Sequence, residues 1–379
     1  MKVGLVCPYS VAKGGGVKEI VFAIQSELRR RGHDAYVITP RPQDHDGEAG
    51  DNVLFVGTSA DFNAPTRTTI QISASVNDTI DAILEEHQFD VLHFHEPWIP
   101  MLSMQILSRS NAVNIGTFHA KLPETMVSRT MAKVVTPYTK SVLKYIDAFT
   151  AVSDAAAEYV CSQTNQPVAI IPNGIDLQQF TMPKTFHDNR KEKTVLYVGR
   201  LEGRKGVKYL LHAFQTLQER RPDVRLVLAG DGNDREKLEQ LAADLELTNT
   251  DFLGYVTHEK KVQLYQEADL YCSPAIYGES FGVVLLEAMA TGLVTVAGDN
   301  PGYSSVMSGL GSLSLVDPKH TAEFARRLEL LLYEKDLRKL WRQWAVNELP
   351  QYSYEHIVSQ YEEVYQTAML AKAAKKELA

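Results

Sequence analysis

The chain has 379 residues and a mass of 42.3 kDa, which is long for a single hydrophobic core and favours two domains. Apolar residues make up 44% of it and charged residues 23%, as in a soluble globular protein and unlike a disordered or fibrous one. The formal net charge of -8 excludes a chain that is basic throughout, so nucleic acid is not expected as a partner.

Short apolar runs alternate with helical stretches through the first half. The expected strands are KVGLV (2–6), AYVIT (35–39), NVLFV (52–56), DVLHFH (90–95), NIGTFH (114–119), AFTAVS (148–153) and VAIIP (168–172). Strands this apolar are covered on both faces, which indicates a parallel sheet flanked by helices. Between the first two strands, VKEIVFAIQSELRRRG (17–32) predicts an amphipathic helix that stops at Gly32.

A glycine-rich loop, Gly14 to Gly16, follows the first strand. Backbone without side chains can approach a ligand closely, so we expect Gly15 and Gly16 to lie against a phosphate or sugar, with a plain turn as the alternative. A dinucleotide fingerprint is disfavoured, because the last glycine of G-x-G-x-x-G is replaced by Glu19. The D-x-D pattern at Asp44 to Asp46 lies in a polar loop away from any strand end, so neither a metal nor a cofactor is predicted.

Histidines end two of the expected strands: His95, followed by Glu96, and His119. In open α/β sheets, ligands bind at the carboxyl ends of the strands. We therefore expect a functional role for His119 and, for His95, a structural hydrogen bond.

The second half repeats the pattern, with strands at TVLYVG (194–199), VRLVLAG (224–230), DFLGY (251–255), DLYCSP (269–274) and LVTVAG (293–298). A turn at Asn173-Gly174 and the polar residues after it place the domain boundary near 180 to 192. The predicted fold class is α/β, with two Rossmann-like, doubly wound parallel-sheet domains that face a deep cleft.

Cations and carboxylates follow strands of the second half. GRLEGRKG contains Arg200 and Lys205, which suit a diphosphate that gains charge as it leaves; a solvated basic loop is the alternative. GESFGVVLLEAMATG (278–292) predicts a helix that starts near Phe281, with Glu279 outside its first turn and Glu287 about two turns in. Together these residues predict that Glu287 binds ribose hydroxyls and that Glu279 binds hydroxyls of the group attached to the diphosphate.

The last segment, SYEHIVSQYEEVYQTAMLAKAAKKELA (353–379), predicts one long helix with Tyr354, Ile357, Val358, Tyr361 and Tyr365 on one face. No segment approaches the ~20 apolar residues of a membrane-spanning helix. The three cysteines are widely spaced, as expected of reduced thiols, so we expect a cytoplasmic protein whose contact with a membrane would be peripheral.

At this point a family resemblance becomes specific. ESFGVVLLEAMATG resembles the E-x(7)-E signature of the retaining family 4 glycosyltransferases, which have two Rossmann domains in the GT-B architecture. GRLEGRKG, AVSD, IPNGID and LAGDGND also fall where that family has them, so the resemblance spans nearly the whole chain. VGLVCPYSVAKGGGVKE, DVLHFHEP and TFHA look most like the phosphatidylinositol mannosyltransferases, which transfer mannose from GDP-mannose to an inositol ring at a membrane face.

The resemblance implies a role for each matching residue. Arg200 and Lys205 would neutralise the donor diphosphate, with Gly15, Gly16, Ser280 and the backbone amides of Phe281, Gly282 and Val283 beside it. Glu279 would hold the donor sugar, Glu287 the ribose, and the backbone near Tyr255 and Val256 the base. His119 would lie by the reacting face of the sugar, and Tyr9, Glu96 and His119 would line the acceptor side.

The resemblance also implies the chemistry and the domain limits. Transfer would retain the anomeric configuration through an oxocarbenium-like state, without a metal, and the departing phosphate oxygen would take the acceptor's proton. The domains would be 1–180 with 355–379, and 190–354, because the C-terminal helix would cross back onto the first domain.

One region departs from the mannosyltransferase pattern. Where those enzymes have a basic amphipathic helix, SVNDTIDAILEEHQ (75–88) has four acidic residues and no lysine or arginine, so anionic lipid would be repelled. A partial substitute is KLPETMVSRTMAKVVTPYTKSVLKYI (121–146), in which Arg129, Lys133, Lys140 and Lys144 come at helical spacing. A solvated face is the alternative, and Pro137 is expected to break this helix.

The predicted partners are thus a nucleotide-sugar donor, most simply GDP-mannose, and a lipid or glycan acceptor. The alternatives are a glucosyl- or galactosyltransferase that uses a UDP-sugar on diacylglycerol or a polysaccharide, and a non-catalytic protein that binds nucleotide sugars. A dehydrogenase is disfavoured by the failed fingerprint. The oligomeric state is left open.

Overall fold

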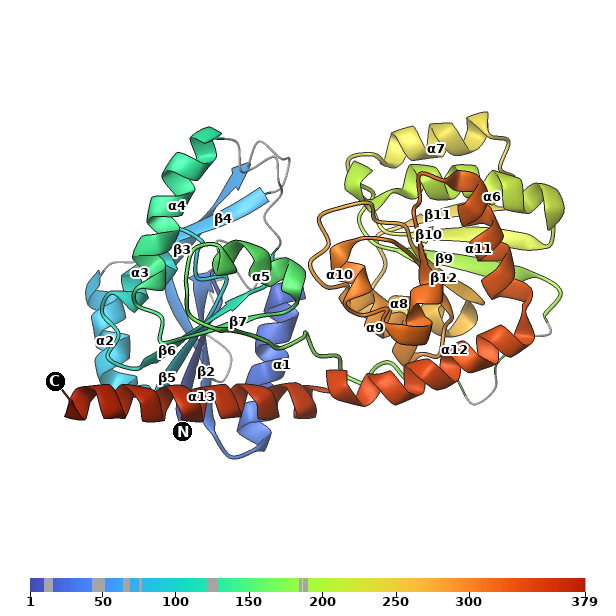
Figure 1. Cartoon of the computed structure of the whole chain (residues 1–379). Coiled ribbons are helices and arrows are strands. Elements are labelled where there is room, and N and C mark those ends of the chain that lie inside the picture. Colours follow the sequence, from blue (N-terminus) through green and yellow to red (C-terminus); the bar gives the residue numbers. More distant parts are fainter. Residues whose placement is uncertain are drawn as a thin grey trace. The chain divides into compact units, whose positions relative to one another are not determined.

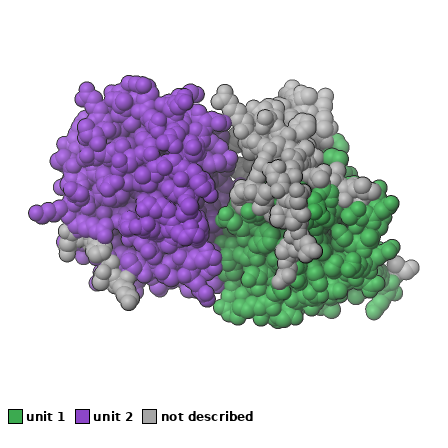
Figure 2. Space-filling view, turned by 180° about the vertical axis from the view of Figure 1, so that it is seen from behind, with its two compact units in different colours: residues 1–174, 354–379 green, residues 175–353 purple. Residues whose placement is uncertain are grey.

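The computed structural model describes residues 1–9, 16–42, 52–63, 69–74, 77–120, 129–183, 186 and 190–378, with the backbone alone for 58–63, 69–74 and 129–135 (Figure 1). This chain forms two compact units, residues 1–174 with 354–379 and residues 175–353 (Figure 2). Each unit is a mainly parallel sheet flanked by helices. The prediction of two Rossmann-like α/β domains is confirmed.

The first unit contains an eight-stranded sheet in the order β4-β3-β2-β1-β5-β6-β7-β8. Its strands are β1 (Lys2–Val6), β2 (Asp34–Arg41), β3 (Val53–Asn63), β4 (Thr69–Ala74), β5 (Val91–His95), β6 (Val113–Phe118), β7 (Ala148–Ala151) and β8 (Val168–Ile170). The seven predicted strands are present. The edge strand β4, which pairs antiparallel with β3, was not predicted.

The helices of the first unit are α1 (Gly16–Arg30), α2 (Asn77–His87), α3 (Leu102–Leu107), α4 (Arg129–Leu143), α5 (Asp154–Cys161) and α13 (Tyr354–Glu377). Helix α1 ends as predicted, because Gly32 adopts a φ of 85° that favours glycine. The prediction that Pro137 breaks its helix is wrong, since α4 continues through it. Pro137 is exposed, and α4 tolerates the hydrogen bond that is lost there.

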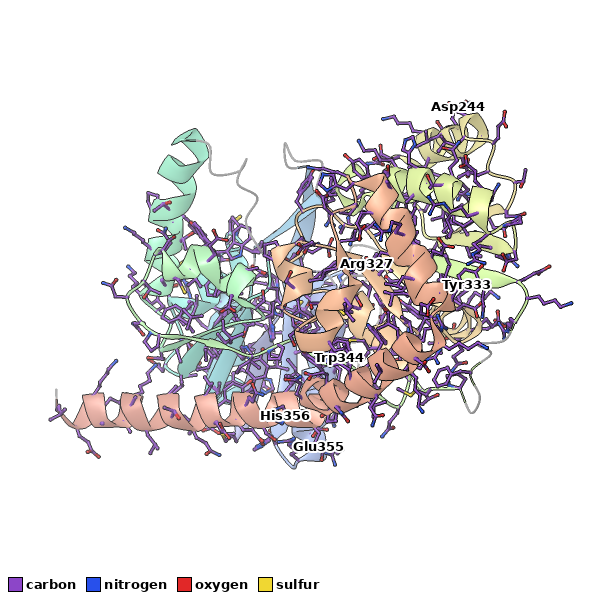
Figure 3. All side chains as sticks on the ribbon, turned by 45° about the vertical axis from the view of Figure 1, so that its right-hand side comes forward. Asp244, Arg327, Tyr333, Trp344, Glu355 and His356 are labelled. Atoms are coloured by element: carbon purple, nitrogen blue, oxygen red, sulfur yellow. The ribbon has the colours of Figure 1, made fainter. Side chains whose placement is uncertain are left out.

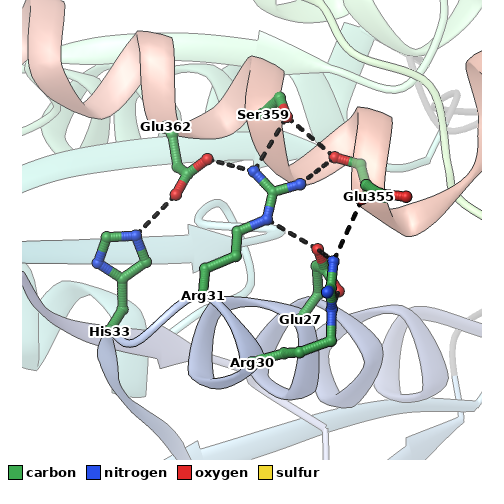
Figure 4. Close-up of polar contacts among 7 residues, drawn as sticks. All are labelled: Glu27, Arg30, Arg31, His33, Glu355, Ser359 and Glu362. Atoms are coloured by element: carbon green, nitrogen blue, oxygen red, sulfur yellow. Dashed lines mark hydrogen bonds and ion pairs between the residues drawn. The ribbon is translucent and has the colours of Figure 1, made fainter.

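Helix α13, the C-terminal helix, packs on the first unit as expected. Its buried face contains Ile357, Val358, Tyr361, Tyr365 and Ala368, which share a core with α1 and the sheet. A polar cluster joins the C-terminal end of α1 to the start of α13 (Figure 4). In this cluster Glu362 accepts hydrogen bonds from Arg31 and His33.

The second unit contains a six-stranded, fully parallel sheet in the order β11-β10-β9-β12-β13-β14. Its strands are β9 (Lys193–Val198), β10 (Val224–Ala229), β11 (Thr250–Gly254), β12 (Leu270–Ser273), β13 (Thr295–Gly298) and β14 (Leu315–Val316). The five predicted strands are confirmed, and the two-residue β14 was not predicted.

The helices of the second unit are α6 (Val207–Arg220), α7 (Arg235–Asp244), α8 (His258–Glu267), α9 (Val283–Ala290), α10 (Pro301–Ser304), α11 (Thr321–Tyr333) and α12 (Lys335–Glu348), with short 3-10 turns η2 (Gly203–Lys205), η3 (Gly309–Ser314) and η4 (Leu349–Tyr352). Helix α11 carries Arg327 and Tyr333, which are labelled in Figure 3. Arg327 donates to the carbonyl of Leu315 at 2.9 Å, and Tyr333 donates to Asp223 at 2.9 Å.

The chain passes between the units after Gly174 and again after Ser353. The sequence had placed the first crossing later, near 180 to 192. The difference arises because the residues after Gly174 already pack in the second unit: Ile175 N–H donates to the carbonyl of Tyr352 at 2.8 Å, and Phe180 lies edge-on to Tyr265. Across the described residues, no helix combines the length and apolar character needed to cross a bilayer.

Candidate active site

A basic loop follows β9 in the second unit and contains Arg200, Arg204 and Lys205. The loop is fixed at Gly206, where φ is 70° and an added Cβ would lie 2.0 Å from the carbonyl oxygen of Pro274. Only glycine fits there, so the loop is held against the end of β12. The cations therefore stand at the carboxyl edge of the sheet, where ligands bind in this fold.

Glu279 lies between two of these cations. One of its carboxylate oxygens accepts from Arg204 Nη1 at 2.7 Å and from Lys205 Nζ at 2.8 Å. Arg204 also contacts Glu202, which pairs with Arg200. Burial lowers the pKa of Lys205, while Glu279 acts in the opposite direction. Three cations and two carboxylates leave one positive charge in excess, which an anionic ligand can neutralise.

Helix α9 begins beside this cluster, but at Val283 rather than near Phe281 as predicted. Gly282 precedes it with a φ of 114°, and an added Cβ there would lie 2.7 Å from the ring of Tyr303. Glu287 is consequently the fifth residue of the helix, in its second turn. The amides at the start of a helix carry partial positive charge, so the start of α9 adds to the attraction for an anion.

Glu287 is buried and bonded to two side chains of α8. Its oxygens accept from Lys261 Nζ at 2.7 Å and from Tyr265 OH at 3.0 Å. A carboxylate oxygen can accept a second hydrogen bond, so a ribose hydroxyl remains compatible with this arrangement. Arg204, Lys261 and Tyr265 were not selected from the sequence. Arg204 could have been found beside Lys205, whereas α8 carries no motif.

Other predicted donor residues lie at the same edge of the sheet. Tyr255 and Val256 follow β11, after Gly254 at a φ of 72°, and Tyr255 is 84% exposed. Ser280 and Phe281 lie between Glu279 and the start of α9, and Phe281 is buried against Tyr352. An exposed aromatic ring at a strand end suits stacking or edge contact with a base.

In the first unit, Glu96 is buried after β5 with an unusual φ of 54°. One of its oxygens accepts from the His119 backbone N–H at 2.6 Å, and the other accepts from Trp98 Nε1. Burial raises the pKa of Glu96 to about 7, although the hydrogen bonds from these two donors act to lower it. Both oxygens are thus engaged inside the unit, so Glu96 holds the loop that follows β6 in place.

The histidines of β5 and β6 form a buried row. His95 Nδ1 lies 2.9 Å from His119 Nε2, with the two rings stacked. His93, which was not selected from the sequence, bonds to Tyr365 of α13 at 2.7 Å and to Thr117 at 2.6 Å. Burial lowers the pKa of His119 to about 4 and that of His93 to about 3, so these rings are neutral at pH 7.

The other residues selected from the sequence are Tyr9, the glycines before α1, the D-x-D pattern and the basic residues of α4. Tyr9 is half-buried, and burial together with the charge of Glu96 raises its pKa well above the ordinary value. Gly16 is the exposed first residue of α1, and no described atom lies within 4 Å of a Cβ built there. Gly15 and Asp44 to Asp46 lie outside the described residues, as do the side chains of Arg129 and Lys133. No group of three or more histidines, cysteines or acidic residues in the described part is arranged to hold a metal.

Two family models together match most of the chain. The model described as Glycosyltransferase Family 4 matches residues 14–179, and the model of group 1 glycosyl transferases matches residues 179–347. The chain is 32% identical over 371 residues to a phosphatidyl-myo-inositol mannosyltransferase of Mycolicibacterium smegmatis, covering 97% of this chain and 94% of that one. The protein of the same name in Mycobacterium leprae is 32% identical, with 97% of each covered.

A shorter similarity and the solved structures complete the comparison. A D-inositol 3-phosphate glycosyltransferase of Corynebacterium urealyticum is 34% identical over 218 residues, 53% of this chain and 51% of that one. Sucrose-phosphate synthase from Thermosynechococcus elongatus superposes with a TM-score of 0.75 at 20% identity, covering 98% of this chain and 99% of that one. Anabaena Alr3699/HepE in complex with UDP gives 0.74 at 18% identity, covering 97% and 100%. These two structures share the fold.

Proposed function

This chain belongs to the family 4 glycosyltransferases, and on that premise we propose that it transfers mannose from GDP-mannose to the inositol ring of a phosphatidylinositol lipid. The acceptor is proposed from relatives of that name that align over nearly the whole chain. The proposed binding of the donor rests on the basic loop, which has an excess positive charge beside the start of α9.

The donor roles are proposed residue by residue. Arg200, Lys205 and the amides of Phe281, Gly282 and Val283 hold the diphosphate, and Arg204 joins them because it shares Glu279 with Lys205. Glu279 holds the hexose hydroxyls, and Glu287 the ribose. Tyr255 and Val256 meet the base, and Gly16 approaches the diphosphate without a side chain in the way.

The chemistry follows from where charge develops. As the glycosidic bond breaks, negative charge grows on the departing phosphate, and cations already in place stabilise it without reorganisation. The departing oxygen takes the proton of the attacking hydroxyl, so the sugar keeps its anomeric configuration. His119, neutral at pH 7, offers a hydrogen bond rather than a charge. We propose that no metal or cofactor takes part, since the side chains supply the charge.

One observation favours a second acceptor, a soluble inositol phosphate. Helix α2 exposes Asp78, Glu85 and Glu86 and contains neither lysine nor arginine, so this face is repelled by anionic lipid. The relative from Corynebacterium urealyticum is named for an inositol 3-phosphate acceptor. A peripheral contact with the cytosolic membrane face would have to use other residues, such as the exposed Lys140 and Lys144 near the end of α4.

A two-by-two assay tests donor and acceptor together. The protein is incubated with GDP-mannose or UDP-glucose, and with phosphatidylinositol vesicles or D-inositol 3-phosphate. We expect mannosyl transfer from GDP-mannose to the vesicles, with the product anomer retained by NMR. Transfer to the soluble phosphate alone would select the second acceptor. Turnover with UDP-glucose alone would contradict the donor, and no turnover with any pair would favour a non-catalytic binding protein.

Substitutions test the basic loop. Arg200→Ala and Lys205→Ala should each lower kcat by about 10²-fold or more, because a preorganised charge at the leaving group is lost. Their melting temperatures should stay close to that of the wild type. Arg225→Ala is the matched control, since Arg225 forms an exposed pair with Asp251 on the same sheet. A folded Lys205→Ala protein with normal kcat would refute the proposed role.

A further inference from the structure

Two exposed aromatic rings stand at the edge of the second unit where ligands bind in this fold. Tyr255 is 84% exposed and Tyr277 is 59% exposed, and no other phenylalanine, tyrosine or tryptophan side chain of the described residues is more than half exposed. Tyr255 follows β11 and Tyr277 follows β12, so both lie at the carboxyl edge of the six-stranded sheet. Tyr255 is proposed to meet the base, whereas Tyr277 has no part in the proposed function.

The backbone around Tyr277 is fixed on both sides by one residue of the basic loop. The N–H of Ile276 donates to the carbonyl of Arg204 at 3.0 Å, and the carbonyl of Gly278 accepts from Arg204 Nη1 at 3.3 Å. Gly278 has a φ of 75°, which favours glycine. The Tyr277 ring therefore projects from a bend whose position is set by the cations beside it.

The Tyr277 side chain does not take part in the packing of its own unit. Among the residues that the structure describes, none forms a hydrogen bond or a ring contact with it. The nearby Tyr303 is the contrasting case, since it is fully buried and its hydroxyl lies 2.7 Å from that of Ser273. Removing the Tyr277 ring should consequently leave the fold intact.

The order of side chains along the sheet edge is more informative than exposure, because single exposed apolar residues are common. The strand order β11-β10-β9-β12 puts the basic loop, which follows β9, between the two rings. At about 4.8 Å per strand, β11 and β12 are about 14 Å apart. A nucleotide-diphosphate sugar has a planar base at one end, two phosphates in the middle and a pyranose ring at the other end. Ring, cations and ring thus follow one another as the parts of such a ligand do.

Tyr277 and Glu279 together offer the two kinds of contact that a sugar ring needs. A pyranose has hydroxyl groups around its rim and C–H groups on its faces. The Glu279 carboxylate, held by Arg204 and Lys205, can accept hydrogen bonds from the rim. The Tyr277 ring, two residues earlier, is an apolar surface with a polarised face that C–H groups can cover.

We propose that the Tyr277 ring packs against a C–H face of the donor hexose and fixes the orientation of the sugar while Glu279 holds its hydroxyls. The inference deepens the proposed function and rests on it for the identity of the hexose. The contact uses the ring rather than the phenol hydroxyl, so phenylalanine should replace the tyrosine.

Isothermal titration of the full-length protein with GDP and with GDP-mannose, without acceptor, tests the contact. Tyr277→Ala should raise the Kd for GDP-mannose about fivefold or more, as expected when the apolar contact of one ring face is lost. The Kd for GDP should not change, because GDP has no hexose, and this unchanged affinity also shows that the variant is folded. Tyr277→Phe should bind both ligands as the wild type does.

Two further variants serve as controls. Tyr255→Ala should raise the Kd values for GDP and GDP-mannose by similar factors, because both ligands contain the base. Leu340→Ala removes an apolar side chain of α12 that is 58% exposed, close to the exposure of Tyr277, and should change neither Kd.

The inference is overturned if Tyr277→Ala weakens GDP and GDP-mannose equally, if it leaves GDP-mannose binding unchanged, or if it raises only the KM for the acceptor. Binding of GDP-mannose that depends on Tyr277, without any sugar transfer, would instead refute the proposed function and leave this contact standing. A wild type that binds only UDP and UDP-glucose would refute the proposed donor, and the same comparison between those two ligands would then decide the role of Tyr277. A wild type that binds no nucleotide sugar would refute both.

Discussion

Glu96 combines a buried carboxyl group with a strained backbone. Its φ of 54° costs of order 1 kcal/mol or more, and burial raises its pKa to about 7. Between about pH 4.5 and 7 the unfolded chain ionises this group while the folded chain keeps it protonated, so the free energy of unfolding falls as pH rises through that window. His93 and His119 act in the opposite sense, because the unfolded chain binds their protons below about pH 6.5 and the folded chain does not.

The Glu96→Gln variant separates the contribution of Glu96 to the pH dependence of stability from that of the two histidines. Glutamine keeps acceptor capacity for the His119 amide but cannot ionise, so the variant should gain stability relative to the wild type as pH rises. The gain should approach about 2.5 kcal/mol between roughly pH 5 and pH 8, from the size of the pKa shift. Urea denaturation at several pH values measures it. A difference that does not change with pH would show that Glu96 ionises normally in the folded protein.

Residues with a fixed spacing could be predicted from the sequence, and their partners could not. Glu279 and Glu287 were found because they bracket an apolar helix, and Lys205 because it follows a strand and a glycine turn. Their partners Lys261 and Tyr265 lie on α8, a polar helix without a motif, and only the fold brings them to Glu287. Asn173 was predicted only as a turn residue, because nothing in the sequence shows that its side chain contacts His119.

Strands were predicted correctly where burial on both faces determines the apolar pattern of the sequence. The parallel strands are apolar on both faces and were predicted, whereas β4 is an antiparallel edge strand and β14 has two residues. Pro137 was misjudged because sequence alone does not show that it faces solvent within α4. The start of α9 was placed two residues early, because the positive φ of Gly282 keeps it outside the helix.

Arg31, directly after α1, forms several of the polar contacts to α13 that supplement the shared apolar core (Figure 4). Its guanidinium donates to Glu27 at 2.7 Å, to Ser359 at 2.9 Å and to Glu362, and its side chain is 19% exposed. The neighbouring Arg30 also bonds to Glu27 but is 61% exposed. Burial reduces screening by solvent, so the first set of bonds should stabilise the helix contact far more than the second.

Arg31→Ala should therefore lower the free energy of unfolding by about 2 kcal/mol and speed amide exchange in the first turns of α13. Arg30→Ala, one position away, removes exposed contacts with Glu27 and with Glu355 of α13 and should cost less than about 1 kcal/mol. Hydrogen exchange by mass spectrometry on both variants checks this. Equal effects would show that the less exposed bonds of Arg31 to Ser359 and Glu362 do not strengthen the contact with α13.

At the scale of the whole molecule, the residues proposed to bind substrates are divided between the two units. The proposed residues for the nucleotide and its diphosphate, from Arg200 to Glu287, lie in the second unit apart from the glycine loop, while Tyr9, Glu96 and His119, expected on the acceptor side, lie in the first. Each unit has its own sheet and its own buried core. A ligand that binds one folded unit stabilises that unit by mass action, by about 2.7 kcal/mol at a hundredfold excess over Kd.

GDP alone should consequently slow amide exchange in β9, β10 and β12 of the second unit more than in β5 and β6 of the first. The amides that exchange most slowly do so only when their whole unit opens. Slower exchange at these amides therefore shows that the ligand stabilises the unit as a whole, rather than only the residues that it touches. UDP at the same concentration is the comparison, and weaker protection by UDP is expected if the donor is a GDP-sugar. Protection by GDP that is strongest in β5 and β6 would place the nucleotide on the first unit and contradict the assignment of Arg200, Lys205 and Glu287.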